Sequence, residues 1–152
     1  MKDKKHMQVN AIKNGTAIDH IPAKNLFKVV SILGLDKLDQ PVTFGTNMES
    51  SKLGRKAIIK ISDVILDNEE INKIALVAPL AKINIIRDYE VTEKKVVQVP
   101  DFIVGIAKCF NPKCITNNEF VTTKFKVVHG KDISLKCMYC EKITDQEDII
   151  II

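Results

Sequence analysis

The chain has 152 residues, 45% of them apolar and 28% charged, proportions that suit one medium globular domain or two small ones. No apolar run approaches the roughly 18 residues that a membrane helix requires, so we expect no membrane span. The basic first residues are not followed by the apolar segment of a secretory signal, which favours a cytoplasmic location. With an aromatic content of 5% and no Trp, the chain is also poorly suited to stacking nucleic-acid bases.

The first pattern along the chain is a strand that leads into a turn. Residues 6–13 alternate polar and apolar side chains, which is typical of a strand. Asn14-Gly15 follows, a dipeptide that favours tight hairpin turns because both positions must accept a positive φ. We therefore predict a hairpin with residues 16–21 as its second strand. Residues 22–33 begin with a Pro suited to a first helical turn and have apolar positions at helical spacing, and Gly34 is predicted to end this helix.

Two further strands, a second helix and two more strands follow. Residues 42–48 and 56–62 have strand character and are separated by a polar Ser/Gly loop. Asp67 is predicted to cap a helix that has acidic residues in its first turn. Residues 82–88 and 89–99 are predicted to be strands. The order β-α-β-β-α-β favours a ferredoxin-like antiparallel sheet with helices on one face.

The alternation of predicted strands and helices ends near Val99-Pro100-Asp101, where we place a domain boundary. Beyond it, residues 124–129, 133–136 and 143–149 are candidate short strands. The apolar run at residues 149–152 is expected to pair as an edge strand or to pack on a partner, because an exposed apolar tail is unusual.

Four cysteines lie in the last third of the chain with the spacing C-x₄-C-x₂₂-C-x₂-C, namely Cys109, Cys114, Cys137 and Cys140. Two close pairs can place four sulfurs tetrahedrally around one Zn²⁺ ion, and a segment of about 50 residues has too small a core to fold readily without such a cross-link. Four thiolates leave no coordination position for water, so we predict a structural zinc site. An iron site with the same S₄ geometry is the minor alternative, and buried free thiols or a disulfide are further alternatives.

The predicted fold class is therefore α+β with two domains. Residues 1–99 form the ferredoxin-like antiparallel sheet with two helices, and residues 100–152 form a small all-β, zinc-ribbon-like domain.

The charge distribution bears on a second hypothesis, a zinc-ribbon protein that binds nucleic acid. The cysteine pairs and a pI near 8.8 favour it. Residues 101–152 nevertheless contain seven lysines and seven acidic residues, and four metal-bound thiolates would make this segment net negative. The basic excess therefore lies in residues 1–100, and nucleic-acid binding is the less favoured hypothesis.

A third hypothesis is a small enzyme that uses Asp19 and His20, a neighbouring carboxylate–imidazole pair. Adjacent residues of a strand point to opposite faces, so we do not expect them to form an acid–base dyad. The sequence also has no glycine-rich phosphate loop, serine-hydrolase motif or zinc-protease motif. The residues alone favour a binding protein, with Asp19 either capping the next helix or lining a polar pocket together with His20.

Three segments, residues 8–23, 54–61 and 135–142, resemble the regulatory chain of aspartate carbamoyltransferase in order and spacing. The run from Gly15 to Pro22 and the last cysteine pair are the most specific parts of the resemblance. The resemblance implies a non-catalytic subunit of the first committed enzyme of pyrimidine synthesis, in which three regulatory dimers hold two catalytic trimers together.

The resemblance further implies that the first domain binds CTP or ATP, with UTP as a further candidate effector, and that the zinc domain docks on the catalytic chain. No nucleic-acid or membrane partner is implied. Carried over by position, the nucleotide site consists of Val9, Ala11, Ile12, Asp19, His20, Lys60, Asn84, Ile86, Tyr89, Val91 and Lys94. The positions expected to meet the catalytic chain are Asn111, Lys113, Glu119 and Glu141.

Overall fold

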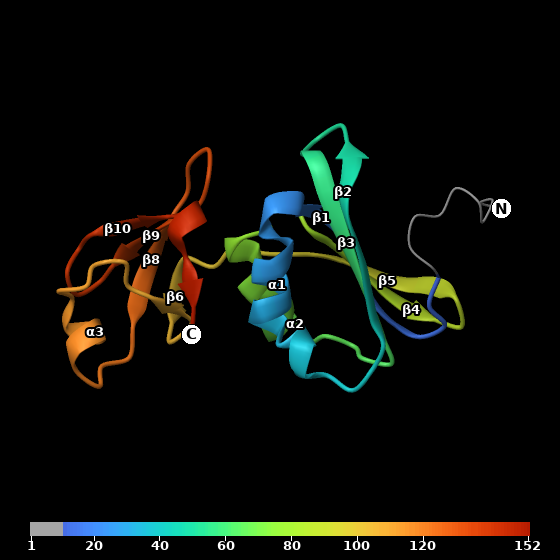
Figure 1. The fold of residues 1–152 in the computed structure, drawn as a ribbon, viewed down its shortest axis with the longest axis horizontal. Coiled ribbons are helices and arrows are strands. Elements are labelled where there is room, and N and C mark those ends of the chain that lie inside the picture. The colour runs from blue at the N-terminus through green and yellow to red at the C-terminus, as the bar shows by residue number, and fades with distance from the viewer. Residues whose placement is uncertain (1–10) are drawn as a thin grey trace. The chain divides into compact units, whose positions relative to one another are not determined.

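The computed structural model describes residues 11–152 and separates into two compact units, the first ending at Val97 and the second running from Gln98 to Ile152. No sheet is shared between the two units in residues 11–152 (Figure 1). No helix within residues 11–152 is long and apolar enough to cross a membrane.

The first unit is an antiparallel sheet of five strands in the order β2-β3-β1-β4-β5, with both helices on one face (Figure 1). Its first four strands and two helices follow the predicted β-α-β-β-α-β order, and β5 extends the sheet beyond β4. The elements are β1 (Gly15–Pro22), α1 (Leu26–Leu33), β2 (Val42–Ser50), β3 (Gly54–Ser62), α2 (Asn68–Lys73), β4 (Lys82–Arg87) and β5 (Glu90–Val96).

The core of this unit lies between the sheet and the helices. The apolar residues that alternate along the three inner strands, including Ile18, Ile59 and Ile83, are fully buried there. The helices contribute Leu26 and Ile71 to the same core. The period of two in the strands thus separates an apolar face under the helices from a face that is free for polar residues.

Both predicted helix signals are confirmed. Gly34 ends α1 in the left-handed conformation, with φ of 62°, which glycine adopts without steric cost. The Asp67 carboxylate accepts a hydrogen bond of 2.8 Å from the Glu70 backbone N–H and so caps α2.

The predicted hairpin at Asn14-Gly15 is wrong in the described residues. Strand β1 is hydrogen-bonded to β3 on one side and to β4 on the other, so neither side is open to a preceding strand, and residues 11–13 form none. Residues 6–10 of that prediction lie outside the described residues. Asn14 instead fastens the start of β1: its backbone carbonyl accepts from Asp63 N–H at 2.9 Å, and its side-chain oxygen accepts from Asp88 N–H at 3.1 Å.

The second unit contains a four-stranded sheet in the order β10-β9-β8-β6 and a two-stranded sheet of β11 and β7. Phe125 and Leu135 are fully buried in its core. The elements are β6 (Phe102–Val104), β7 (Ala107–Lys108), α3 (Ile115–Asn118), β8 (Lys124–Val128), β9 (Ser134–Cys137), β10 (Ile143–Asp145) and β11 (Ile150–Ile151).

The end of the chain differs from the predicted strand over residues 143–149. Strand β10 ends at Asp145, and a 3₁₀ turn over Gln146–Asp148 redirects the chain. The apolar tail then pairs with β7, as predicted for an edge strand, with Ile151 opposite Ala107.

Replacement of Gly15 by alanine tests how closely β1 packs against β3. A Cβ at Gly15 would lie 2.0 Å from the Ile61 carbonyl oxygen, at a φ of 143°. Because backbone must move, we expect Gly15→Ala to lower the free energy of unfolding by about 2–4 kcal/mol in urea titrations followed by circular dichroism.

The matched control is Gly34→Ala. It also has a positive φ, but a Cβ there meets nothing within 4 Å, so we expect a loss of only about 1 kcal/mol. Equal losses in the two variants would contradict the close packing of β1 against β3.

Candidate functional site

The four cysteines converge at one point of the second unit. The Cys109 and Cys140 sulfurs are 3.6 Å apart, the Cys114 and Cys137 sulfurs are 3.7 Å apart, and all four lie within 4.8 Å of one another. Three of the cysteines are buried and Cys140 is partly exposed. The predicted cluster is therefore formed from two loops that are distant in sequence.

These distances fit a tetrahedral zinc site. With Zn–S bonds of about 2.3 Å, neighbouring sulfurs of a tetrahedron lie about 3.8 Å apart. A disulfide requires about 2.05 Å, and all four cysteines are free. The same S₄ geometry also suits iron, so the distances identify a tetrahedral thiolate site and its chemistry favours Zn²⁺ as a structural ion.

The electrostatics of the cluster indicate that a cation belongs in it. Burial raises the pKa of the Cys109 thiol to about 12. Burial also acts to raise the pKa of Cys140, but hydrogen bonds from the Lys142 backbone and the Asn111 side chain outweigh it and lower that pKa to about 7. Four thiolates this close are mutually repulsive, so a divalent ion is needed to compensate their charge.

Asparagine side chains hold the first cysteine loop. The Asn117 amide donates to the Cys109 carbonyl at 2.9 Å and to the Asn111 carbonyl at 2.7 Å. The Asn118 amide donates to the Cys114 carbonyl at 2.8 Å. The loop geometry is therefore set by side chains of the short helix α3, which follows the second ligand directly.

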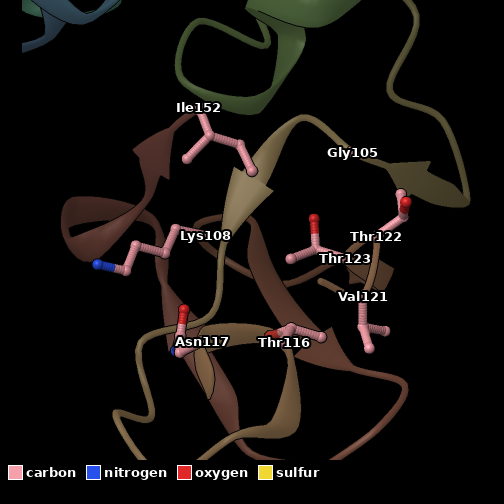
Figure 2. A pocket seen from close by; sticks show the side chains of 8 residues that line it. All are labelled: Gly105, Lys108, Thr116, Asn117, Val121, Thr122, Thr123 and Ile152. Atoms are coloured by element: carbon pink, nitrogen blue, oxygen red, sulfur yellow. The ribbon is translucent and has the colours of Figure 1, made fainter. Parts of the chain in front are cut away.

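A groove of about 540 Å³ lies beside this loop (Figure 2). Two residues that line the groove also support the metal site. The Thr116 hydroxyl lies 3.2 Å from the Cys114 sulfur, and the Asn117 amide makes the two hydrogen bonds described above. On another wall the Thr123 hydroxyl donates to the Ala107 carbonyl at 2.7 Å. These polar groups hold the metal-binding unit together, and Lys108 and Ile152 border the groove from β7 and the tail (Figure 2).

The four positions expected at a protein interface all lie near the cysteine loops. Asn111 and Lys113 lie between the first two cysteines, and Asn111 Oδ1 accepts from the Lys113 backbone N–H at 3.0 Å. Glu119 is the C-cap of α3. Glu141 follows the last cysteine with a positive φ of 66°. All except Asn111 are exposed.

In the first unit, the residues expected at a nucleotide site gather on the helix-free face of the sheet. The pairing places Lys60, Ala17, Asn84 and Lys94 in one row across β3, β1, β4 and β5, because directly paired residues point to the same face. These residues are up to 77 positions apart in sequence, from Ala17 to Lys94. The sheet topology alone brings them together.

A small apolar patch lies at one end of this face. Ile12, Ala17 and Ile86 form a cluster of buried residues that is separate from the helix-covered core. Val91 pairs with Ile86 and is exposed. Such a patch is suited to the flat, apolar surface of a ligand.

Three further predicted residues border the patch or lie outside the described chain. Ala11 is exposed next to Ile12, and Val9 is outside the described residues. Tyr89 lies in the tight turn between β4 and β5, where its backbone N–H donates to the Lys13 carbonyl at 2.8 Å and its ring is 67% exposed.

Asp19 and His20 lie together in a β-bulge, which corrects the argument that neighbouring strand residues must point apart. Ile18 pairs with Ile59 and Ile21 with Ala57, so the two residues between them oppose a single residue of β3. His20 has φ of 62°, and its Nδ1 lies 3.6 Å from Asp19 Oδ2. This distance is too long for a hydrogen bond, so the pair is adjacent without being a dyad.

Asp19 caps no helix but binds a lysine. Its carboxylate lies 3.0 Å from the Lys56 ammonium group and accepts from the His20 backbone N–H at 2.6 Å. His20 Nδ1 is buried and has no hydrogen-bond partner within residues 11–152. Burial lowers the pKa of His20 below 6.5, and the positive charges of Lys56 and Lys82 act in the same direction against that of Asp19.

Sequence reasoning missed Lys56, Asn117 and Asn118. Lys56 lies near the start of β3, opposite Pro22 and beyond the bulge, and no residue pattern in the sequence marks a bulge of this type. The two asparagines carry a usable signal, since asparagine side chains in turns and at helix ends commonly bond to nearby backbone groups.

We predict that binding of the metal ion depends on all four cysteine sulfurs. We expect one Zn²⁺ per chain by elemental analysis, and Co²⁺ substitution should give the absorption bands of a tetrahedral thiolate site. Cys137→Ser should lose the metal and the order of the second unit, whereas Met138→Ser, at an exposed position beside it, should retain both. Full metal content in Cys137→Ser would contradict the site.

Comparisons with known proteins match both units. Residues 7–98 match the family model described as aspartate carbamoyltransferase regulatory chain, allosteric domain. Residues 101–150 match the model for the metal binding domain of the same regulatory chain.

Similar proteins bear the same description over nearly their whole length. The regulatory chain of Bacteroides fragilis is 55% identical over 99% of both chains. That of Pyrococcus horikoshii is 53% identical over 95% of this chain and 96% of its own. The chain therefore belongs to the family of aspartate carbamoyltransferase regulatory chains, the non-catalytic chains of that enzyme, with an allosteric and a metal-binding domain.

Proposed function

We propose that the first unit binds CTP and ATP at one shared site on the helix-free face of its sheet, and that this binding controls the catalytic chain. The observation that carries the proposal is the polarity of that face. An apolar patch lies at one end, and lysines from three different strands, Lys60, Lys82 and Lys94, lie along the rest.

The lysines supply the attraction for a triphosphate. Lys60 and Lys94 stand at the two ends of the row that crosses Ala17 and Asn84, so a ligand lying on that row meets a positive charge from each side. Contacts of ammonium groups with phosphate oxygens are charge-assisted and do not depend on the base. This part of the site serves any nucleoside triphosphate.

The base and ribose are assigned to the opposite end and the middle of the face. Ile12, Ala17 and Ile86 offer an apolar surface for a base. Asp19 and His20 lie two and three positions farther along β1 than Ala17, where a carboxylate and an imidazole can bond to ribose hydroxyls. The buried Nδ1 of His20, which has no partner within residues 11–152, supports this assignment.

Antagonistic effectors can share such a site only if they differ in their fit to two states of the assembly. A nucleotide that binds both states equally shifts nothing, whatever its affinity. A coupling free energy of about 1–3 kcal/mol is typical of such regulation. UTP is a further candidate effector at the same face, because the lysines do not distinguish bases.

We assign docking on the catalytic chain to the metal-binding unit. The cysteine loops carry large exposed apolar side chains next to the ligands, including Phe110, Ile115 and Tyr139. Apolar and aromatic residues at a rigid, metal-held surface favour a protein partner over nucleic acid, which would require a basic face. Asn111, Lys113, Glu119 and Glu141 are the proposed polar contacts.

The proposed division of the chain is residues 1–99 for nucleotide binding and residues 100–152 for docking. In the assembly we propose, three dimers of this chain join two catalytic trimers. A cytoplasmic location agrees with four thiols that must stay reduced to bind a metal.

Calorimetry on the zinc-loaded chain tests the nucleotide site. We expect CTP and ATP to bind with one site per chain and to compete with each other. Lys60→Met should weaken both by about tenfold, since a charge-assisted phosphate contact is lost. Lys108→Met, a lysine of the second unit, is the charge-matched control. Absence of binding by either nucleotide to a folded, zinc-loaded chain would refute the proposal.

Removal of the metal tests the docking assignment. A thiol-reactive mercurial should release the chain from its catalytic partner in gel filtration, because the cysteine loops lose their geometry. CTP binding should stay within about twofold of its original affinity, since the first unit has its own core. Added Zn²⁺ should restore the complex, and a complex that persists after zinc loss would contradict a docking role.

A further inference from the structure

Three of the four cysteine sulfurs accept a hydrogen bond from the backbone N–H that lies two residues farther along the chain. These donors belong to the backbone, so they depend on the turn geometry of the cysteine loops and not on the identity of a side chain. The pairs of donor and sulfur are Asn111 with Cys109, Tyr139 with Cys137 at 3.4 Å, and Lys142 with Cys140.

The fourth sulfur, that of Cys114, has a different donor. Cys114 is the N-cap of α3, yet its side chain makes no capping hydrogen bond to the backbone N–H groups of the first turn. Instead, the Thr116 hydroxyl lies 3.2 Å from the sulfur. A metal-bound thiolate carries no proton, so the hydroxyl is the donor. The donor again comes from two residues farther along, but it is a side chain.

This hydroxyl acts on a sulfur that water reaches poorly. Cys114 is 1% exposed. Four thiolates around one Zn²⁺ ion leave a net negative charge on the site, and each hydrogen bond to a sulfur disperses part of that charge. Partners of this kind, one step removed from the metal, commonly change the affinity of a site by about 10–100-fold when they are lost.

The side chain of Thr116 is suited to hold its hydroxyl in place. Thr116 is half-buried and lines the groove beside the cysteine loop (Figure 2). Its branched Cβ restricts rotation about χ1, so the hydroxyl stays aimed at the sulfur at little entropic cost. The same branched shape without the hydroxyl is available in valine, which makes the contribution of the hydroxyl separable from that of packing.

We propose that Thr116 is a positioning residue of the metal site: its hydroxyl orients the Cys114 thiolate, stabilises its charge, and thereby sets how tightly the metal-binding unit retains its ion. The inference concerns the second unit alone, and its outcome does not depend on the nucleotide site proposed for the first.

The first test is competition between the full zinc-loaded chain and a chelator of known Zn²⁺ affinity. We expect Thr116→Val to weaken Zn²⁺ binding by about tenfold, because the charge on the Cys114 sulfur loses its donor. Thr116→Ser restores the hydroxyl and should stay within about threefold of the unaltered chain. Thr122→Val is the matched control, since Thr122 is an exposed threonine that lines the same groove.

The second test reads the sulfurs directly, through the thiolate-to-metal absorption bands of the Co²⁺-substituted chain. A sulfur without its hydrogen bond gives up electron density more readily, so these bands should move to longer wavelength in Thr116→Val. They should not move in Thr116→Ser or Thr122→Val. Circular dichroism checks the fold of each variant, and Thr116→Ala replaces Thr116→Val in both tests if the valine variant does not fold.

The outcomes separate the hydroxyl from the packing around it. Unchanged Zn²⁺ affinity together with unchanged cobalt bands in Thr116→Val overturns the proposal. An equal loss of affinity in Thr122→Val also overturns it, because disturbance of the groove would then explain the effect. A loss in Thr116→Val that Thr116→Ser does not reverse, with cobalt bands that stay in place, assigns the effect to shape and likewise overturns it.

Discussion

Strand β1 hydrogen-bonds to β3 on one side and to β4 on the other, and the arrangement of the first unit follows from this double pairing. Because Ala17 lies opposite both Lys60 and Asn84, residues from three distant segments share one face. The glycine at position 15 permits the close approach that starts the pairing, since no larger residue fits against the Ile61 carbonyl. A change in register by one residue would turn the lysines into the core.

The second unit depends on a different constraint, the charge of four sulfurs. Thiolates within 4.8 Å of one another repel, and a metal ion converts that repulsion into a cross-link between two loops. Asn117 and Asn118 orient this loop, because their side-chain amides donate hydrogen bonds to the backbone carbonyls of Cys109 and Cys114. The apolar side chains beside the ligands can then stay exposed on a rigid surface, where a partner can cover them.

The sequence was sufficient for features that local chemistry determines. Cysteine spacing predicted the cluster, Gly34 and Asp67 marked helix ends, and the alternating strands gave the face of the sheet. It failed where tertiary pairing overrides a local preference. Asn14-Gly15 favours a hairpin, but in this fold both sides of the following strand are occupied by β3 and β4. The bulge at Asp19 and His20 depends on the register of β1 against β3, which neither residue encodes alone.

The division of the sheet face into an apolar end and a lysine end limits where regulation can originate. At the nucleotide site that we propose, CTP and ATP would present the same phosphates, so the lysines would contribute nearly the same free energy to both and would not separate their effects. The difference would then arise where the nucleotides differ, over Ile12, Ala17 and Ile86. In this proposal, a larger base on the patch would extend toward the β4–β5 turn at Tyr89, whose backbone N–H is bonded to the Lys13 carbonyl. The proposal thus assigns discrimination between effectors to the apolar end of the sheet face and affinity to its lysines.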